Sequence, residues 1–176
     1  MKTTIKRKIK LSLFFFLILV ILALFFIKPW EKQPTHIHAD FKVYLNDNQL
    51  NFSQPKYQER SPAVHVEDGD GDVVHIHLKG IKLVDFFNSL GIKFTDTCFA
   101  LDTQESFCNN DKNKLRVYIK GYGEDWRPSF DYGNYVIKDM DRILITYGDA
   151  GKINKELGTV TNKSEKISLN PGNSTC

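Results

Sequence analysis

The chain has 176 residues with 24 basic and 21 acidic side chains, so its formal net charge is +3. This charge is unevenly divided, because residues 1–34 carry a net charge of +6 and residues 35–176 a net charge of −3. The positive excess lies in one terminal block rather than on a folded surface, which argues against nucleic-acid binding. An apolar fraction of 41% argues against wholesale disorder, and the residues after position 34 suffice for one modest domain.

An apolar run at residues 11–27 contains one hydroxyl group and no charge. At about 1.5 Å per residue it is at the short end of what spans a hydrocarbon core of roughly 30 Å. A cleaved secretory signal peptide is the alternative, but it requires small residues at its cleavage site, and this run ends in Phe25, Phe26 and Ile27. We therefore predict an uncleaved transmembrane helix, a signal-anchor, over residues 11–27, followed by a spacer over residues 28–34.

Five basic side chains precede this apolar run. By the positive-inside rule they keep residues 1–10 in the cytoplasm and send the remainder across the membrane. The predicted location is the cell membrane, with a single pass, a cytoplasmic N-terminus and an extracytoplasmic domain over residues 35–149. The three cysteines suit that compartment, because disulfides persist outside the reducing cytosol.

The predicted domain begins with two extended elements. Apolar and polar residues alternate strictly over residues 35–45, the pattern of a strand with one buried face. Alternation on both sides of the acidic, glycine-rich run 68–72 predicts a β-hairpin over residues 64–78. If this hairpin is centred on Asp70, His65 lies opposite His75.

A helix and further strands follow the hairpin. Apolar residues at three- and four-residue steps predict a short amphipathic helix over residues 81–90, with Gly91 as its C-terminal cap. A small hairpin is expected over residues 98–108, and strands over residues 115–119 and 142–147. Residues 150–176 are predicted to be a polar, largely disordered tail with at most a short helix near its start.

The order strand, strand, helix, strand, strand resembles the β-grasp (ubiquitin-like) fold. Residues 136–143 in particular look like the acidic turn before the last strand of the sulfur-carrier branch of that fold. Those carriers end in an activated Gly-Gly, whereas this chain continues past Gly148. The resemblance therefore implies an α+β fold, a β-grasp-like mixed sheet with one packed helix, and not the carrier chemistry.

The histidines form a single pattern on the predicted strands. All five take the polar parity of the alternation: His36, His38, His65, His75 and His77. The His-x-His spacing puts two imidazoles on one face of a strand, with Cα atoms about 6.6–6.8 Å apart. The hairpin brings His65 beside His75, and pairing with the first strand would bring in the others, with Asp40 and Glu67 within reach as ligands or supporting acids.

This pattern predicts a transition-metal site. Neutral imidazole ligands without a thiolate favour Zn(II) or Cu(II), with three ligands typical of an open, catalytic site and four or more of a closed or storage site. Two other interpretations remain open, namely solvated histidines on an exposed sheet face and a histidine pH switch. The acids of the run 68–72 resemble the start of a calcium loop, but Lys79 stands where an EF-hand has its bidentate Glu.

Two of the cysteines are expected to pair. Cys98 and Cys108 would be cross-strand neighbours in the small hairpin, which favours a structural disulfide. A redox dithiol is the alternative, but oxidoreductases of the thioredoxin type place their cysteines two residues apart at a helix N-terminus, and nine residues separate these two. Cys176 is left over.

Several stretches also carry a family resemblance. They are residues 36–46, 64–71, 74–77, 85–91 and 142–148, together with Cys98 and Cys108. These stretches are similar to an uncharacterised group of His-rich, membrane-anchored proteins of archaea and uncultivated bacteria. The resemblance covers about residues 35–148 and implies a shared topology and histidine pattern. Some members carry an automatic label of protein-disulfide isomerase, but this chain lacks a Cys-x-x-Cys motif, so no catalytic residue is carried over.

The sequence as a whole predicts a membrane-anchored domain that binds a divalent metal and captures or delivers it at the membrane surface. A zinc-dependent hydrolase or hydratase, with a metal-activated water, is the main alternative. A thiol-disulfide oxidoreductase and a non-metal interaction module that uses the aromatic loop at residues 122–135 are the others. A protein partner or a homo-oligomer is left open.

Overall fold

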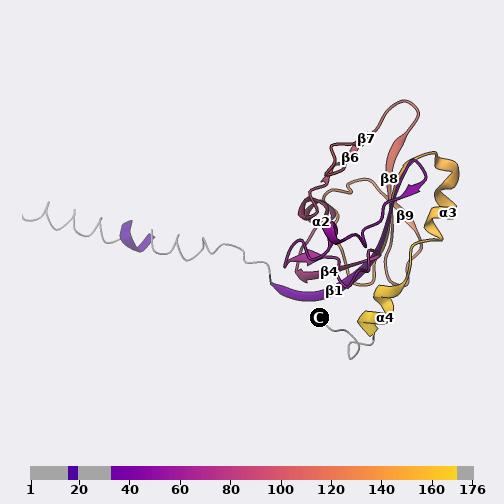
Figure 1. Cartoon of the computed structure of the whole chain (residues 1–176). Helices are drawn as coiled ribbons and strands as arrows, with labels where there is room; N and C mark the ends of the chain where they lie inside the picture. Colours follow the sequence, from indigo (N-terminus) through magenta and orange to yellow (C-terminus); the bar gives the residue numbers. More distant parts are fainter. Residues whose placement is uncertain (1–15, 20–32, 170–176) are drawn as a thin grey trace, which may run out of the picture. The chain divides into compact units, whose positions relative to one another are not determined.

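The computed structural model describes residues 16–19, which are helical, and residues 33–169 (Figure 1). Its contacts divide the chain into one unit of residues 1–32 and another of residues 33–176. Most of the predicted transmembrane segment 11–27, and all of residues 1–10, lie outside the described residues. Within the described ranges, no helix is both long and apolar enough to cross a membrane. Membrane anchoring therefore stays a prediction.

Seven strands of the described domain form one mixed sheet, so the fold is α+β with a predominance of sheet. Its two central strands, β1 and β10, run parallel, and each has an antiparallel neighbour on its other side. The path across the sheet is β3 (Val64–His65), β4 (Val73–Leu78), β1 (Pro34–Leu45), β10 (Arg142–Gly148), β8 (Lys114–Lys120) and β9 (Arg127–Ser129), with β2 (Asn48–Gln49) paired to the end of β1. The predicted hairpin over residues 64–78 is confirmed, and His65 lies opposite His75.

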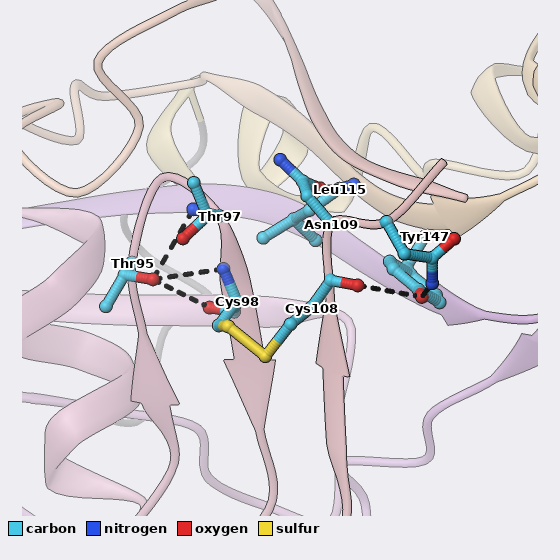
Figure 2. Close-up of a disulfide and its surroundings, with 8 residues drawn as sticks. Thr95, Thr97, Cys98, Cys108, Asn109, Leu115 and Tyr147 are labelled. Atoms are coloured by element: carbon cyan, nitrogen blue, oxygen red, sulfur yellow. Dashed lines mark hydrogen bonds between the residues drawn. A yellow bond between two sulfur atoms is a disulfide. The ribbon is translucent and has the colours of Figure 1, made fainter. Parts of the chain in front are cut away.

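A second, three-stranded sheet contains the predicted disulfide. It consists of β5 (Lys93–Phe94), β6 (Cys98–Ala100) and β7 (Ser106–Cys108). Cys98 and Cys108 face each other across β6 and β7 and are bonded, which confirms the small hairpin and its bridge (Figure 2). Tyr147 of β10 donates its hydroxyl to the carbonyl of Cys108 (3.0 Å), so the bridged hairpin is also attached to the main sheet.

One face of the main sheet packs on α2 (Leu83–Ser89), which confirms the predicted helix. Phe86 and Phe87 of this helix are fully buried against Phe41, which has the opposite parity to the histidines of β1. Gly91 has the positive φ of a helix-terminating glycine, as its predicted role as C-terminal cap requires. The 3-10 turn η1 (Pro55–Tyr57) adds Tyr57 to the same core. The apolar residues of the alternating pattern therefore form the core on one face of the sheet. The histidines, which alternate with them, lie on the other face.

The prediction of a largely disordered segment after residue 149 is wrong for residues 150–169. The chain there forms η2 (Ala150–Lys152), α3 (Ile153–Leu157) and α4 (Lys163–Leu169), and α4 lies against β1 (Figure 1). The physical reason is a buried acceptor, because Asp40 of β1 is 0% exposed and accepts hydrogen bonds from the backbone nitrogens of Lys163 and Ser164, both 2.9 Å away. This polar segment is ordered by hydrogen bonds to a residue that lies more than a hundred positions earlier in the chain.

The acidic turn before β4 is part of the same network. The Lys163 ammonium contacts both Asp70 (2.9 Å) and Asp72 (3.1 Å), and Lys42 of β1 also pairs with Asp72. Two lysines thus supply the positive charge that a calcium ion would bring to a loop of this composition. The turn serves as an attachment point for α4.

Candidate metal centre

The strand pairing gathers the five histidines on the face of the sheet opposite α2. His38 of β1 lies directly across from His75 of β4, and His65 of β3 lies across from His75 on the other side. His36 and His77 lie two residues away on the same strands and have the same parity. The predicted pairing of the first strand with the hairpin is therefore confirmed.

The imidazole rings form a closed circuit of neighbours. Their centroid separations are His36–His38 4.7 Å, His38–His75 4.8 Å, His75–His65 6.1 Å, His65–His77 4.9 Å and His77–His36 5.1 Å. A set of solvated side chains on an exposed sheet would not need such mutual contact. His38 and His75 are moreover only 4% and 7% exposed.

Three of the five bring their ligand nitrogens together. One ring nitrogen each from His36, His38 and His75 lies within 4.8 Å of the other two. With a metal–nitrogen bond of about 2.0–2.1 Å and a tetrahedral angle, two ligands of one ion are about 3.3 Å apart. Small side-chain rotations would bring the nitrogens from separations of up to 4.8 Å to about 3.3 Å, so the cluster could hold a metal ion. His36 is exposed and provides the open side of the cluster.

Glu67 supports His75 rather than completing the ligand set. One carboxylate oxygen lies 3.2 Å from His75 Nδ1, and the other lies 2.9 Å from His65 Nε2. A carboxylate on Nδ1 orients the ring so that coordination would go through Nε2, an arrangement common behind metal-binding histidines. The prediction that Glu67 lies near the histidines is correct, and the geometry assigns it the supporting role.

His65 is held between two oxygen acceptors. Its Nδ1 lies 2.7 Å from the carbonyl oxygen of Ser61, and its Nε2 faces the Glu67 carboxylate. Both ring nitrogens therefore face oxygen atoms of Ser61 and Glu67, and neither is directed to the cluster formed by the other three. His65 thus contacts the same Glu67 carboxylate that lies on His75.

His38 has a supporting group of its own, which comes from α4. Its Nδ1 lies 3.1 Å from Ser168 Oγ, and Ser168 in turn donates to Asp139 Oδ1 at 2.8 Å. The same Asp139 oxygen accepts the backbone N–H of His38 at 2.9 Å. The other ring nitrogen, His38 Nε2, is buried and has no hydrogen-bond partner among the described residues. Sequence reasoning missed Ser168 and Asp139, because no local pattern links them to a histidine in β1.

Burial favours the neutral form of three imidazoles of the cluster, those of His38, His75 and His77. Burial lowers the pKa of His38, and repulsion from a protonated His36 would lower it further. Burial likewise lowers the pKa of His75 well below its usual value. It also lowers the pKa of His77, whose side chain is less buried. Neutral imidazole is the form that coordinates metals, so the lowered pKa values of His38 and His75 favour metal binding by these two rings.

Asp40 is not brought to the cluster as a supporting acid. It shares the face of His38 on β1, but its carboxylate oxygens accept hydrogen bonds from Thr161, Lys163 and Ser164 at the start of α4. Its connection with the site is indirect, because it holds the helix that carries Ser168.

Two surface features lie outside the ligand cluster. A hollow of about 510 Å³ adjoins its supporting residues and is lined by Glu59, Ser61, Pro62, His65, Glu67 and Asp68. In the aromatic loop 122–135, Phe130 is 85% exposed, whereas Tyr132 and Tyr135 pack against the core. The loop is thus partly a cover for the core and partly an exposed surface.

No family model, curated protein or solved structure matches this chain.

Proposed function

We propose that this protein binds a divalent transition metal, Zn(II) or Cu(II), through His36, His38 and His75. The observation that carries the proposal is the convergence of one ring nitrogen each from His36, His38 and His75, beside which His38 Nε2 is buried without a partner among the described residues. A buried polar atom without a partner costs about 1–3 kcal/mol, and a metal ion at this point would remove that cost. Nitrogen ligands without a thiolate favour zinc or Cu(II) over softer ions.

The proposal extends to the setting of the domain. The apolar run 11–27 and the basic residues before it support a single-pass anchor with the domain outside the cytoplasm. The Cys98–Cys108 disulfide fits an oxidising compartment. A site there would capture metal at the membrane surface or deliver it. This is also the setting implied by the resemblance to His-rich membrane-anchored proteins.

A β-grasp-like classification belongs to the same proposal. Its support is the order β4-β1-β10-β8 with a parallel central pair, and a helix that follows the first hairpin. This order explains how the first strand comes to lie between the hairpin and the last strand, where His38 can face His75.

Isothermal titration calorimetry with Zn(II) and Cu(II), on the full-length chain in mild detergent, tests the metal site. Single changes of His36, His38 or His75 to alanine are expected to abolish or strongly weaken binding, with circular dichroism confirming that each variant is folded. His77→Ala is the matched control, because it removes an imidazole from the same sheet face but outside the ligand set. Equal binding by wild type and a His38→Ala, His75→Ala double variant contradicts the proposal.

A zinc-dependent hydrolase or hydratase is the second candidate. A three-histidine set leaves a fourth position for a water, whose pKa zinc lowers to about 7, and the hollow beside His65 and Glu67 offers space next to the site. The zinc-loaded protein would then hydrolyse activated esters or hydrate carbon dioxide, and His75→Ala would lose that activity. Zinc-loaded protein that binds the metal tightly and turns over neither substrate rules this candidate out.

A further inference from the structure

We infer that helix α4 is part of the metal centre: Ser168, backed by Asp139, holds His38 in the tautomer that presents Nε2 to the metal, so metal binding and docking of α4 are coupled. This inference rests on the proposed metal site and adds a positioning residue and a means of regulation to it. Ser168 is a positioning residue in this scheme, since it acts only through His38.

The direction of the hydrogen bonds follows from the chemistry of the three groups. A serine hydroxyl has one proton to give, and a carboxylate only accepts. Ser168 donates its proton to Asp139 at 2.8 Å, so toward His38 its oxygen acts as an acceptor. His38 Nδ1 must therefore carry the proton, which leaves the lone pair on Nε2, the buried ring nitrogen that has no partner among the described residues.

The two buried ligands have supports of different origin. Glu67 supports His75 from the same hairpin, eight residues away in sequence. Ser168 supports His38 from a point 130 residues further along the chain. The first support is present whenever the hairpin is formed, whereas the second is present only when α4 is docked on β1. The site can thus lose one of its two supports without loss of the sheet.

The contacts that dock α4 connect it to the strand that carries the ligands. Asp40, two residues from His38, accepts the backbone N–H groups of Lys163 and Ser164 at the start of the helix. At its other end Ser168 contacts Asp139 and His38 directly. Because docking improves the metal site, the bound metal must by reciprocity stabilise docking by the same factor.

Zinc affinity of the full-length chain in mild detergent tests the positioning role. Ser168→Ala is expected to weaken zinc binding by about 10- to 100-fold, the usual effect of removing a group that orients a metal-binding histidine. Ser168→Thr retains the hydroxyl and should restore most of the affinity. Leu169→Ala changes an exposed neighbouring position of the same helix and should leave the affinity unchanged.

Two further measurements respond to the mechanism itself. In metal-free wild type, the 15N chemical shifts of the His38 ring should show a single Nδ1–H tautomer, and Ser168→Ala should shift them toward a mixture. Hydrogen exchange of the amides at residues 163–169 should slow when zinc binds to wild type, and this zinc dependence should be lost in Ser168→Ala.

The possible failures are distinguishable. If wild type binds no zinc, the proposed metal site itself is wrong. If wild type binds zinc while Ser168→Ala binds it equally well, the metal site stands and the role of Ser168 is refuted. Because the exchange measurement on wild type alone also tests the coupling, a zinc-independent rate at residues 163–169 overturns it even if a variant fails to fold.

Discussion

Replacing Asp40 should release α4 from the sheet while leaving the sheet folded. The Asp40 carboxylate is 0% exposed and accepts hydrogen bonds from two backbone N–H groups, of Lys163 and Ser164, and from the hydroxyls of Thr161 and Ser164. Asp40→Ala removes every one of these acceptors. The hydroxyls can rotate toward other partners, but the two backbone donors cannot.

The expected magnitude follows from those two donors. Each buried donor left without a partner costs about 1–3 kcal/mol, so Asp40→Ala should cost about 2–6 kcal/mol if α4 stayed in place. The helix can instead detach and let water satisfy its amides, which limits the observed loss to the free energy of docking. Asp40→Asn retains one acceptor oxygen and should cost less, about 1–2 kcal/mol.

Hydrogen exchange distinguishes detachment from unfolding. In Asp40→Ala, amides at residues 163–169 should exchange nearly as fast as a free peptide, while those of β8 and β10 remain protected. Asp102→Asn is the matched control, since its partner Lys56 is exposed and such pairs contribute little. Wild-type protection of residues 163–169 in Asp40→Ala would refute the argument that this carboxylate holds the helix.

Three other predictions concern the stability of the domain. Replacing both disulfide cysteines with serine should lower the free energy of unfolding by about 3 kcal/mol, the chain-entropy value for a bridge of this span, and an unchanged urea midpoint would contradict that. Gly71→Ala should destabilise the domain by about 2 kcal/mol or more, because the added Cβ would overlap the backbone nitrogen of Ser53. Gly151→Ala, whose added Cβ would make only ordinary van der Waals contact with the Asp149 side chain, should be tolerated in the same urea titration. Burial alone would raise the pKa of Asp72, but hydrogen bonds from two lysines outweigh it and hold that pKa below its usual 3.8. The stability that Asp72 contributes should therefore be present above pH 3.8 and be lost as the pH falls through its lower folded-state pKa, so an Asp72→Asn variant that keeps the wild-type pH dependence of the urea midpoint would contradict the assignment.

The half of the fold governed by local pattern could be predicted from the sequence. Alternation over residues 35–45 assigns His38 to the face opposite Phe41, and the acidic turn at residues 68–72 sets the register that pairs His65 with His75. These inferences succeed because side chains on a strand alternate with a period of two and a short hairpin has few registers. Cross-strand placement of Cys98 and Cys108 follows in the same way.

The polar long-range contacts could not be predicted. Nothing in the sequence near Asp40 indicates that its partners lie at residues 161–164, and nothing near Ser168 indicates a histidine. A polar segment is ordered only if it finds buried partners, and composition does not reveal partners. The error on residues 150–169 and the missed role of Ser168 therefore have one cause, which is that both depend on hydrogen bonds between distant parts of the chain.

Without a metal, the histidine cluster is an unfavourable way to fill this face of the sheet. His38 Nε2 lacks a partner among the described residues, at a cost of about 1–3 kcal/mol. Burial also lowers the pKa of His75, so protonation of that ring carries a further cost. Apolar side chains of similar size would avoid both costs. A metal at 100 times its dissociation constant adds about 2.7 kcal/mol of stability, which is enough to offset them. The cost of the empty cluster thus supports the proposed metal site, and under the proposed coupling α4 would be docked on β1 when that site is filled.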